Sequence, residues 1–232
     1  MLTMSKVVRN TGILTQVILR DEVYDYLRGN ILHHHFPPGY RFDLKKLEKI
    51  LGISRTPLKD ALHRLESEGL VKIRPRRGTF VTPLDTKSVA ESFDVRMMLE
   101  TAAAPIVLAN ATDHELAQLE EMNLQMRALL ESADYQTIIQ QYIDIDQALH
   151  VQYMSYTRNK QLMRIYNRLN THLQIARVKG HFSPKNSHET QEEHEAVLAA
   201  INARDVTALQ YAINNHLQQS KQRTLSALSD HE

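Results

Sequence analysis

The chain has 232 residues, enough for one large or two small domains, and its apolar content of 42% is ordinary for a globular protein. It contains no cysteine, which excludes disulfide bonds and thiolate metal sites and favours a reducing, cytoplasmic location. No uninterrupted apolar run reaches about 18 residues, so no membrane span is predicted. The first 16 residues lack a long apolar core, and we do not expect a signal peptide there.

The net charge of +1 conceals an uneven distribution of charge along the chain. Residues 1–82 contain 15 Lys and Arg against 8 Asp and Glu, whereas residues 83–232 contain 13 basic and 19 acidic side chains. A basic N-terminal part joined to an acidic remainder suggests a domain that binds a polyanion and a second, partner domain. Charge alone is weak evidence, because many basic surfaces are simply solvated.

The basic part of the chain begins with two predicted helices. Residues 1–15 are expected to form a flexible lead-in, and apolar residues at helical spacing predict a first helix over residues 16–32. The segment 44–51 (LKKLEKIL) predicts a short second helix, and Gly52 is suited to end it.

A third helix and a β-hairpin complete this domain, which is predicted to span residues 16–82. Ser54 or Thr56 can cap the third helix, and Pro57 suits its first turn. The segments LVKI and TFVT predict two short strands, 70–73 and 79–82, joined by the arginine-rich turn RPRRG. The expected buried stripe of the third helix consists of Leu58, Ala61, Leu62 and Leu65.

This order of elements is typical of a winged helix-turn-helix that reads DNA. Such a domain contacts bases from the exposed start of its third helix, where cationic side chains also neutralise phosphates. An arginine-rich hairpin tip can reach the adjacent backbone or the minor groove. The plainer alternative is a small helical fold with a solvated basic face. The residues expected to contact DNA are Arg41, Lys45, Lys46, Ser54, Arg55, Thr56, Lys59, Arg64, Arg74, Arg76, Arg77 and Gly78.

The rest of the chain is predicted to be helical, which makes the fold mainly α. Residues 83–85 form an expected linker, residues 86–228 an all-α antiparallel bundle, and residues 229–232 a tail. Thr112 followed by Glu115 is a capping-box pattern, and SPKNS at 183–187 predicts a loop. The expected helices span about 86–109, 113–132, 134–156, 159–180, 188–203 and 205–228.

Four metal-competent side chains lie on the predicted inner faces of these helices. Asp146 and His150 are four residues apart and therefore point the same way, while His194 and His216 lie among apolar residues of two later helices. Each buried polar group needs a partner. Separate hydrogen bonds could provide those partners, and so could one divalent metal ion. Three nitrogens and one oxygen without sulfur suit Zn²⁺, Ni²⁺ or Mn²⁺.

Two parts of the chain resemble a known family. PGYRFDLKKLEKILGISRTPLKDALHRLESEGLVKIRPRRGTFV resembles the winged helix-turn-helix of the GntR superfamily of bacterial transcription regulators, although Lys59 stands where Arg is commoner. Residues 94–100 (DVRMMLE), 146–150 (DQALH) and 192–201 (EEHEAVLAAI) resemble the FCD ligand-binding domain of its FadR-type subgroup. The resemblance implies one divalent metal ion per chain, held by Asp146, His150, His194 and His216.

The resemblance also implies an effector. A small carboxylate or hydroxy acid would complete the metal's coordination, and Arg96 could clamp its carboxylate because Arg pairs bidentately with that group. Thr190, His172 and Arg177 are further candidates for effector contacts. The alternative for all four is a structural ion pair or a surface position.

The sequence therefore predicts a transcription regulator, expected to be a repressor, that binds double-stranded operator DNA as a homodimer and responds to a small organic acid. A metal-dependent enzyme acting on a small carboxylic acid is one alternative, because an Asp/His₃ site with open positions can activate water. A second alternative keeps DNA binding and makes the metal purely structural.

Overall fold

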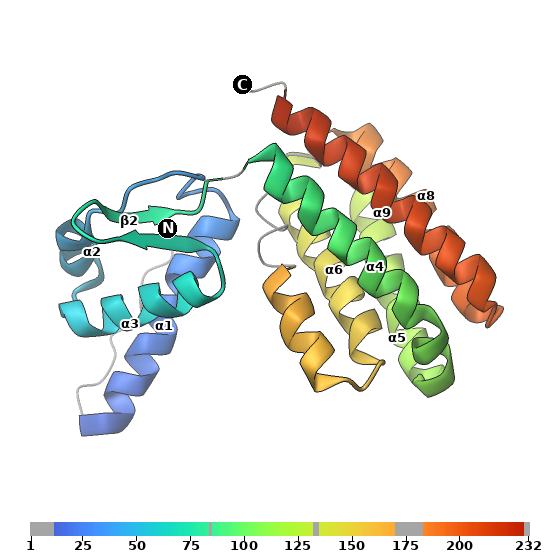
Figure 1. Ribbon diagram of the computed structural model, residues 1–232, viewed down its shortest axis with the longest axis horizontal. Coiled ribbons are helices and arrows are strands. Elements are labelled where there is room, and N and C mark those ends of the chain that lie inside the picture. Colours follow the sequence, from blue (N-terminus) through green and yellow to red (C-terminus); the bar gives the residue numbers. More distant parts are fainter. Residues whose placement is uncertain (1–11, 84, 132–134, 170–182, 230–232) are drawn as a thin grey trace. The chain divides into compact units, whose positions relative to one another are not determined.

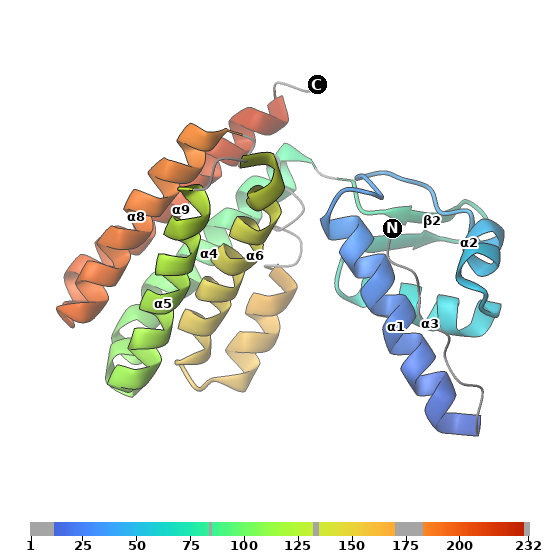
Figure 2. The same cartoon turned by 180° about the vertical axis from the view of Figure 1, so that it is seen from behind.

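The computed structural model describes residues 12–83, 85–131, 135–169 and 183–229 (Figures 1 and 2). The chain divides after Pro83 into two compact units, a small one with a β-hairpin and a larger helical one. None of the described helices is long and apolar enough to cross a membrane. The fold is mainly α, as the sequence predicts.

The N-terminal unit is built from three helices: α1 (Gly12–Leu32), α2 (Leu44–Leu51) and α3 (Arg55–Ser67). Asp43 caps α2 by accepting a hydrogen bond from the Lys46 backbone N–H at 3.0 Å, and Gly52 ends it with a φ of 65°. Helix α1 packs against α3. Their shared core consists of fully buried side chains, including Leu27, Ile31, Leu58, Leu62 and Leu65.

A short antiparallel hairpin follows α3. Strands β1 (Val71–Arg74) and β2 (Gly78–Val81) pair with Val71 opposite Val81 and Arg74 opposite Gly78. Each strand is shifted by one residue from the range predicted for it. The segment before α2 pairs with the outer edge of β2, because Arg41 forms a bridge with Phe80 and the Phe42 backbone N–H donates to the Thr79 carbonyl at 2.9 Å. These contacts join the hairpin to the segment that leads into α2.

The C-terminal unit is a helical bundle. Its elements are α4 (Thr86–Asn110), α5 (Asp113–Leu130), α6 (Tyr135–Ser155), a helix over residues 160–169, α8 (Pro184–Asn202) and α9 (Val206–Ser229). The predicted capping box at Thr112 and Glu115 is present, and Asp85 caps α4 by accepting from the Ser88 backbone N–H at 2.8 Å.

Five of these helices close a ring around a common core. Helix α4 packs on α9, α9 on α8, α8 on α5, α5 on α6, and α6 back on α4. Figure 2 shows α8 and α9 side by side, joined by a three-residue turn and therefore antiparallel. Residues projecting from all five helices toward the centre of the ring are brought together even when they are far apart in sequence.

Two helices begin four residues earlier than predicted, and a third prediction lies partly outside the described residues. Helix α8 begins at Pro184, so the loop predicted at 183–187 is wrong: Pro184 occupies the first position of the helix, where its missing N–H costs nothing. Helix α1 begins at Gly12, inside the predicted lead-in, because nothing between Gly12 and Gly29 interrupts a helix. The helix predicted over residues 159–180 is described only to residue 169.

Candidate metal centre and DNA-binding surface

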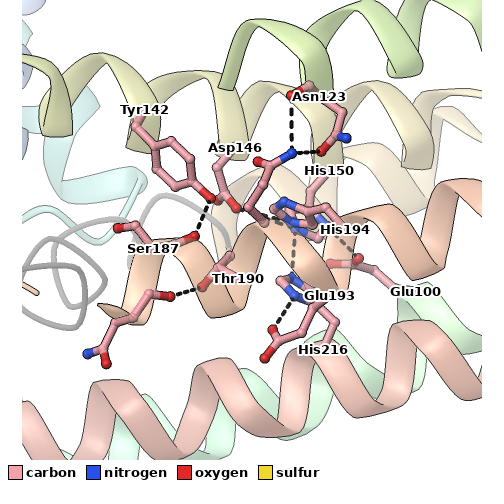
Figure 3. Close-up of polar contacts among 12 residues, drawn as sticks. Glu100, Asn123, Tyr142, Asp146, His150, Ser187, Thr190, Glu193, His194 and His216 are labelled. Atoms are coloured by element: carbon pink, nitrogen blue, oxygen red, sulfur yellow. Dashed lines mark hydrogen bonds and ion pairs between the residues drawn. The ribbon is translucent and has the colours of Figure 1, made fainter. Parts of the chain in front are cut away.

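The four predicted ligands meet inside the helical bundle (Figure 3). Asp146 and His150 project from α6, His194 from α8 and His216 from α9, and all four side chains are buried. The Nε2 atom of His194 lies 3.3 Å from the Asp146 Oδ1 atom, and the Nε2 atoms of His150 and His216 lie 3.2 Å apart. One ligand atom from each residue lies within 4.8 Å of all the others.

Two carboxylates determine which ring nitrogen of His150 and of His216 faces this centre. Glu100 of α4 approaches the Nδ1 atom of His150 at 2.9 Å, and Glu193 of α8 approaches the Nδ1 atom of His216 at 3.0 Å. A carboxylate only accepts, so each Nδ1 carries the proton and each Nε2 presents a lone pair. Two such lone pairs 3.2 Å apart repel one another unless a proton or a metal ion lies between them. The donor set therefore fits a divalent metal.

The surroundings of Glu100 keep Glu100 ionised and His150 neutral, the states in which His150 can bind a metal. Burial by itself raises the pKa of Glu100, but the charge of Arg96 and the hydrogen bonds from His150 and Tyr166 outweigh it and hold that pKa at about 2. Burial lowers the pKa of His150, and the Arg96 guanidinium lowers it further. The carboxylate is therefore ionised and the imidazole neutral, which is the form of histidine that binds metals.

Sequence reasoning did not single out Glu100 or Glu193. Glu100 closes the DVRMMLE segment four residues after Arg96, and Glu193 directly precedes His194, so both lay beside residues already identified. Their bonds to histidine cross 50 and 23 residues of sequence. No local pattern predicts such pairings. The signal that could have marked Glu100 is its position one helical turn after Arg96, the candidate carboxylate clamp.

Arg96 is fully buried next to the centre. Its Nε atom donates to Glu100 Oε1 at 2.5 Å, and its two terminal nitrogens have no hydrogen-bond partner among the described residues. The other end of Glu100 is held by His150, and the Tyr166 hydroxyl also donates to Glu100 at 2.6 Å. Arg96 is therefore fixed by its Nε atom, and its two terminal nitrogens lie in the protein interior near Tyr166.

Of the other three candidate effector contacts, the structure describes only Thr190. Thr190 is buried but already donates to the Asn186 carbonyl at 2.8 Å and accepts from Arg223 at 3.0 Å. Its hydroxyl therefore stabilises α8 and Arg223, and we do not retain it as an effector contact. His172 and Arg177 lie outside the described residues.

In the N-terminal unit the candidate DNA contacts are solvent-exposed, apart from the partly buried Gly78. Ser54 occupies the N-cap of α3 without a side-chain capping bond, which leaves its hydroxyl available at the exposed start of that helix. Arg55 makes only a loose ion pair with Glu48, at 3.9 Å. The guanidinium groups of Arg41 and Arg74 both lie over the Phe80 ring, 5.9 and 5.8 Å from its centroid.

Two of the predicted DNA contacts also have structural roles. Arg64 lies over the Tyr24 ring at 3.6 Å and donates to Asp21 at 3.1 Å, so it fastens α3 to α1. Gly78 has a φ of 119°, and a Cβ atom there would approach the Arg41 Nε atom to 3.1 Å. Gly78 therefore permits the hairpin turn and leaves room for the Arg41 side chain.

Comparisons with known proteins identify both units. The bacterial regulatory proteins of the gntR family match residues 19–81, and the FCD domain matches residues 91–219. The transcriptional regulator YdhC of Bacillus subtilis is 25% identical over 84% of this chain and 86% of its own length. The transcriptional repressor RspR of Escherichia coli is 27% identical over 87% of this chain and 86% of its own.

Solved structures agree with this assignment at the level of the fold. The structure of McbR/YncC of E. coli has a TM-score of 0.75, covers 92% of this chain and 99% of its own, and is 22% identical in sequence. The FCD match alone spans more than half of the chain, and the domains and relatives are those of regulators rather than enzymes. This protein therefore belongs to the FCD-domain regulators of the GntR family, which are DNA-binding transcription regulators.

Proposed function

We propose that this regulator is a repressor whose operator binding is controlled by a small organic acid, bound beside a divalent metal ion in the helical bundle. The observation that carries this proposal is the convergence of one nitrogen from each of three histidines with one carboxylate oxygen, beside the buried Arg96, which Glu100 links to His150. Zn²⁺, Ni²⁺ and Mn²⁺ all suit this donor set. The ion would supply open coordination positions for an acid, and Arg96 would pair with its carboxylate.

Helix α4 offers a direct route for the control. It carries both Arg96 and Glu100, and it begins at Thr86, immediately after the segment 83–85 that joins the two units. An acid held by Arg96 would therefore act on the helix that leads to the DNA-binding unit. The coupling requires that the acid bind more tightly to the arrangement of the protein that has low operator affinity.

We further propose that the start of α3 and the hairpin tip make the contacts to operator DNA. Arg55, Thr56 and Lys59 would face bases and phosphates, and the tip arginines would reach the neighbouring groove. The remaining phosphate contacts would come from Arg41, Lys45, Lys46, Ser54, Arg74, Arg76 and Arg77. Support comes from their exposure and from the excess of basic residues in this unit.

We also propose that the protein binds a short pseudo-palindromic operator as a homodimer. Support comes from apolar side chains that the described chain leaves in contact with solvent: Met98 and Ile106 of α4 and Tyr211 of α9 are 69%, 47% and 77% exposed. A second copy covering them would remove this area from water. Sedimentation of the purified protein tests this part of the proposal.

The decisive experiment measures operator release. Metal-loaded protein is bound to the DNA upstream of its own gene and titrated with carboxylic acids, while fluorescence anisotropy reports the bound fraction. Release by an acid in wild-type protein, and no release in the Arg96→Met variant, is the expected result. If acids cause neither release nor a thermal shift, while metal removal lowers the melting temperature, the metal is purely structural.

A further inference from the structure

The β-hairpin of the N-terminal unit has two faces of opposite character. Side chains alternate along a strand, so neighbours in sequence point to opposite faces of the sheet. The face that carries Thr79 and Val81 is buried in the unit, with exposed fractions of 5% and 0%. The opposite face, which is the outer face of the hairpin, consists of Lys72, Arg74, Gly78 and Phe80.

Phe80 lies among three cationic side chains on this outer face. Lys72 is its partner on β1, and Arg41 is its partner on the other side, where the segment before α2 pairs with β2. Residues that pair directly across strands project to the same face. The guanidinium carbons of Arg41 and Arg74 lie 5.9 and 5.8 Å from the centroid of the Phe80 ring, within the range of a cation–π attraction. One ring therefore holds two arginines that come from different segments of the chain.

The Arg41 side chain lies over Gly78, which is paired with Arg74. A Cβ atom at Gly78 would approach the Arg41 Nε atom to 3.1 Å and a terminal nitrogen to 3.7 Å, so the glycine leaves the space that Arg41 occupies. Neither these two arginines nor Lys72 forms an ion pair with an acidic side chain in the described part of the chain. Like charges held together without a counter-charge repel one another, so an anion that contacts all three is bound favourably.

We propose that the Phe80 ring positions these cations as one phosphate-binding site, through which the outer face of the hairpin holds the backbone of duplex DNA. A phosphodiester fits because guanidinium groups bind phosphate through two parallel N–H donors, and DNA presents phosphates in a continuous row. Such contacts fix the position of a protein on DNA without reading its sequence. The inference rests on the proposed function, which places DNA at this unit, and adds Lys72 and Phe80, which sequence reasoning did not single out.

The test compares how hairpin variants of the full-length, metal-loaded protein bind the DNA upstream of its own gene. Fluorescence anisotropy measures the affinity over a range of salt concentrations. Phe80→Leu keeps an apolar side chain but removes the ring, and is expected to weaken binding about five- to tenfold because two exposed cation–π contacts are lost. Phe80→Tyr keeps the ring and is expected to bind like wild-type protein. Lys72→Ala is expected to reduce the dependence of log affinity on log salt concentration by about 1, since one phosphate contact is removed.

A double-mutant cycle separates positioning from a general effect on the fold. In protein that carries Arg41→Ala and Arg74→Ala the ring has no guanidinium to hold, so adding Phe80→Leu is expected to cause no further loss of affinity. Tyr26→Leu is the matched control, because Tyr26 is an exposed aromatic residue of the same unit over which no guanidinium lies in the described structure. It is expected to bind like wild-type protein. The melting temperature shows whether each variant is folded.

Three results overturn the inference: equal affinities for folded Phe80→Leu and wild-type protein, an undiminished loss on adding Phe80→Leu to the double arginine variant, or an unchanged salt dependence in Lys72→Ala. Arg55→Ala, at the start of α3, tests the proposed function separately. If Arg55→Ala weakens binding and the hairpin variants do not, only the inference fails. If none of these variants weakens binding, the proposed DNA-binding surface itself fails.

Discussion

The proposed role of Glu193 in orienting His216 as a metal ligand gives the sharpest prediction. Its carboxylate lies 3.0 Å from the His216 Nδ1 atom, and Arg223 holds it there through contacts of 2.7 and 2.8 Å. Substituting Glu193→Ala leaves the His216 ring free to present either nitrogen. The loss of such a partner is expected to weaken metal binding by about 10–100-fold, which corresponds to about 1.4–2.7 kcal/mol.

Glu193→Gln separates orientation from charge. An amide oxygen can still accept the Nδ1 proton of His216, but without the negative charge that makes the imidazole a stronger ligand. We therefore expect its metal affinity to lie between those of wild-type protein and Glu193→Ala. The absorption spectrum of the Co²⁺-loaded variants is expected to follow the same order, because it reports the arrangement of ligands around the ion.

A matched control lies two residues further along α8. Glu195 also pairs with an arginine, Arg127, but contacts none of the histidines in the described structure, and its side chain is 38% exposed. Titration of metal-free protein against a chromophoric chelator measures the metal affinity of each variant. Equal affinities for Glu193→Ala and wild-type protein would refute the reasoning. An equal loss in Glu195→Ala would show that α8 is merely destabilised.

Other predictions concern DNA binding, stability and pH. Arg76→Ala is expected to reduce the dependence of log operator affinity on log salt concentration by about 1, measured by anisotropy, with Lys87→Ala as an unaffected control. Thr112→Ala removes the capping box and is expected to lower the free energy of unfolding in urea by about 1 kcal/mol. Hydrogen bonds from Arg158 and the Thr112 backbone lower the pKa of Glu115 to about 2, so its stabilising effect is complete above the ordinary pKa of 4.5 and is lost as the pH falls through 2. In Arg158→Ala, carboxyl NMR titration is expected to show a Glu115 pKa closer to 4.5. Metal at 100 times its Kd is expected to raise the free energy of unfolding by about 2.7 kcal/mol over metal-free protein.

The proposed effector site and the proposed switch share helix α4. Arg96 and Glu100 lie one turn apart on it, so the position of the acid and the position of the His150 ring depend on the same backbone. Lys221 of α9 also pairs with Asp94, which lies two residues before Arg96. A small movement of α4 would therefore be felt both at the metal ligands and at the segment that leads to the DNA-binding unit.

Local sequence determined most of the elements and the identity of the four candidate ligands. Helical periodicity placed Asp146 and His150 on one face of α6, and the apolar neighbours of His194 and His216 placed both on inner faces. Those signals are local, because they depend only on residues one or two turns away. The start of α8 was missed for an equally local reason, since Pro184 suits both a loop and the first position of a helix.

Tertiary structure alone decided what each polar side chain contacts. The contact between the Arg64 guanidinium and the ring of Tyr24, 40 residues earlier in the sequence, exists only because α1 packs against α3. Glu100 and Glu193 contact His150 and His216, two of the candidate metal ligands, only because the ring of helices brings them together. The buried Gln191 amide donates to Asn123, 68 residues away. Periodicity predicts which face of a helix is buried, but a buried polar group is satisfied by whichever helix packs against that face.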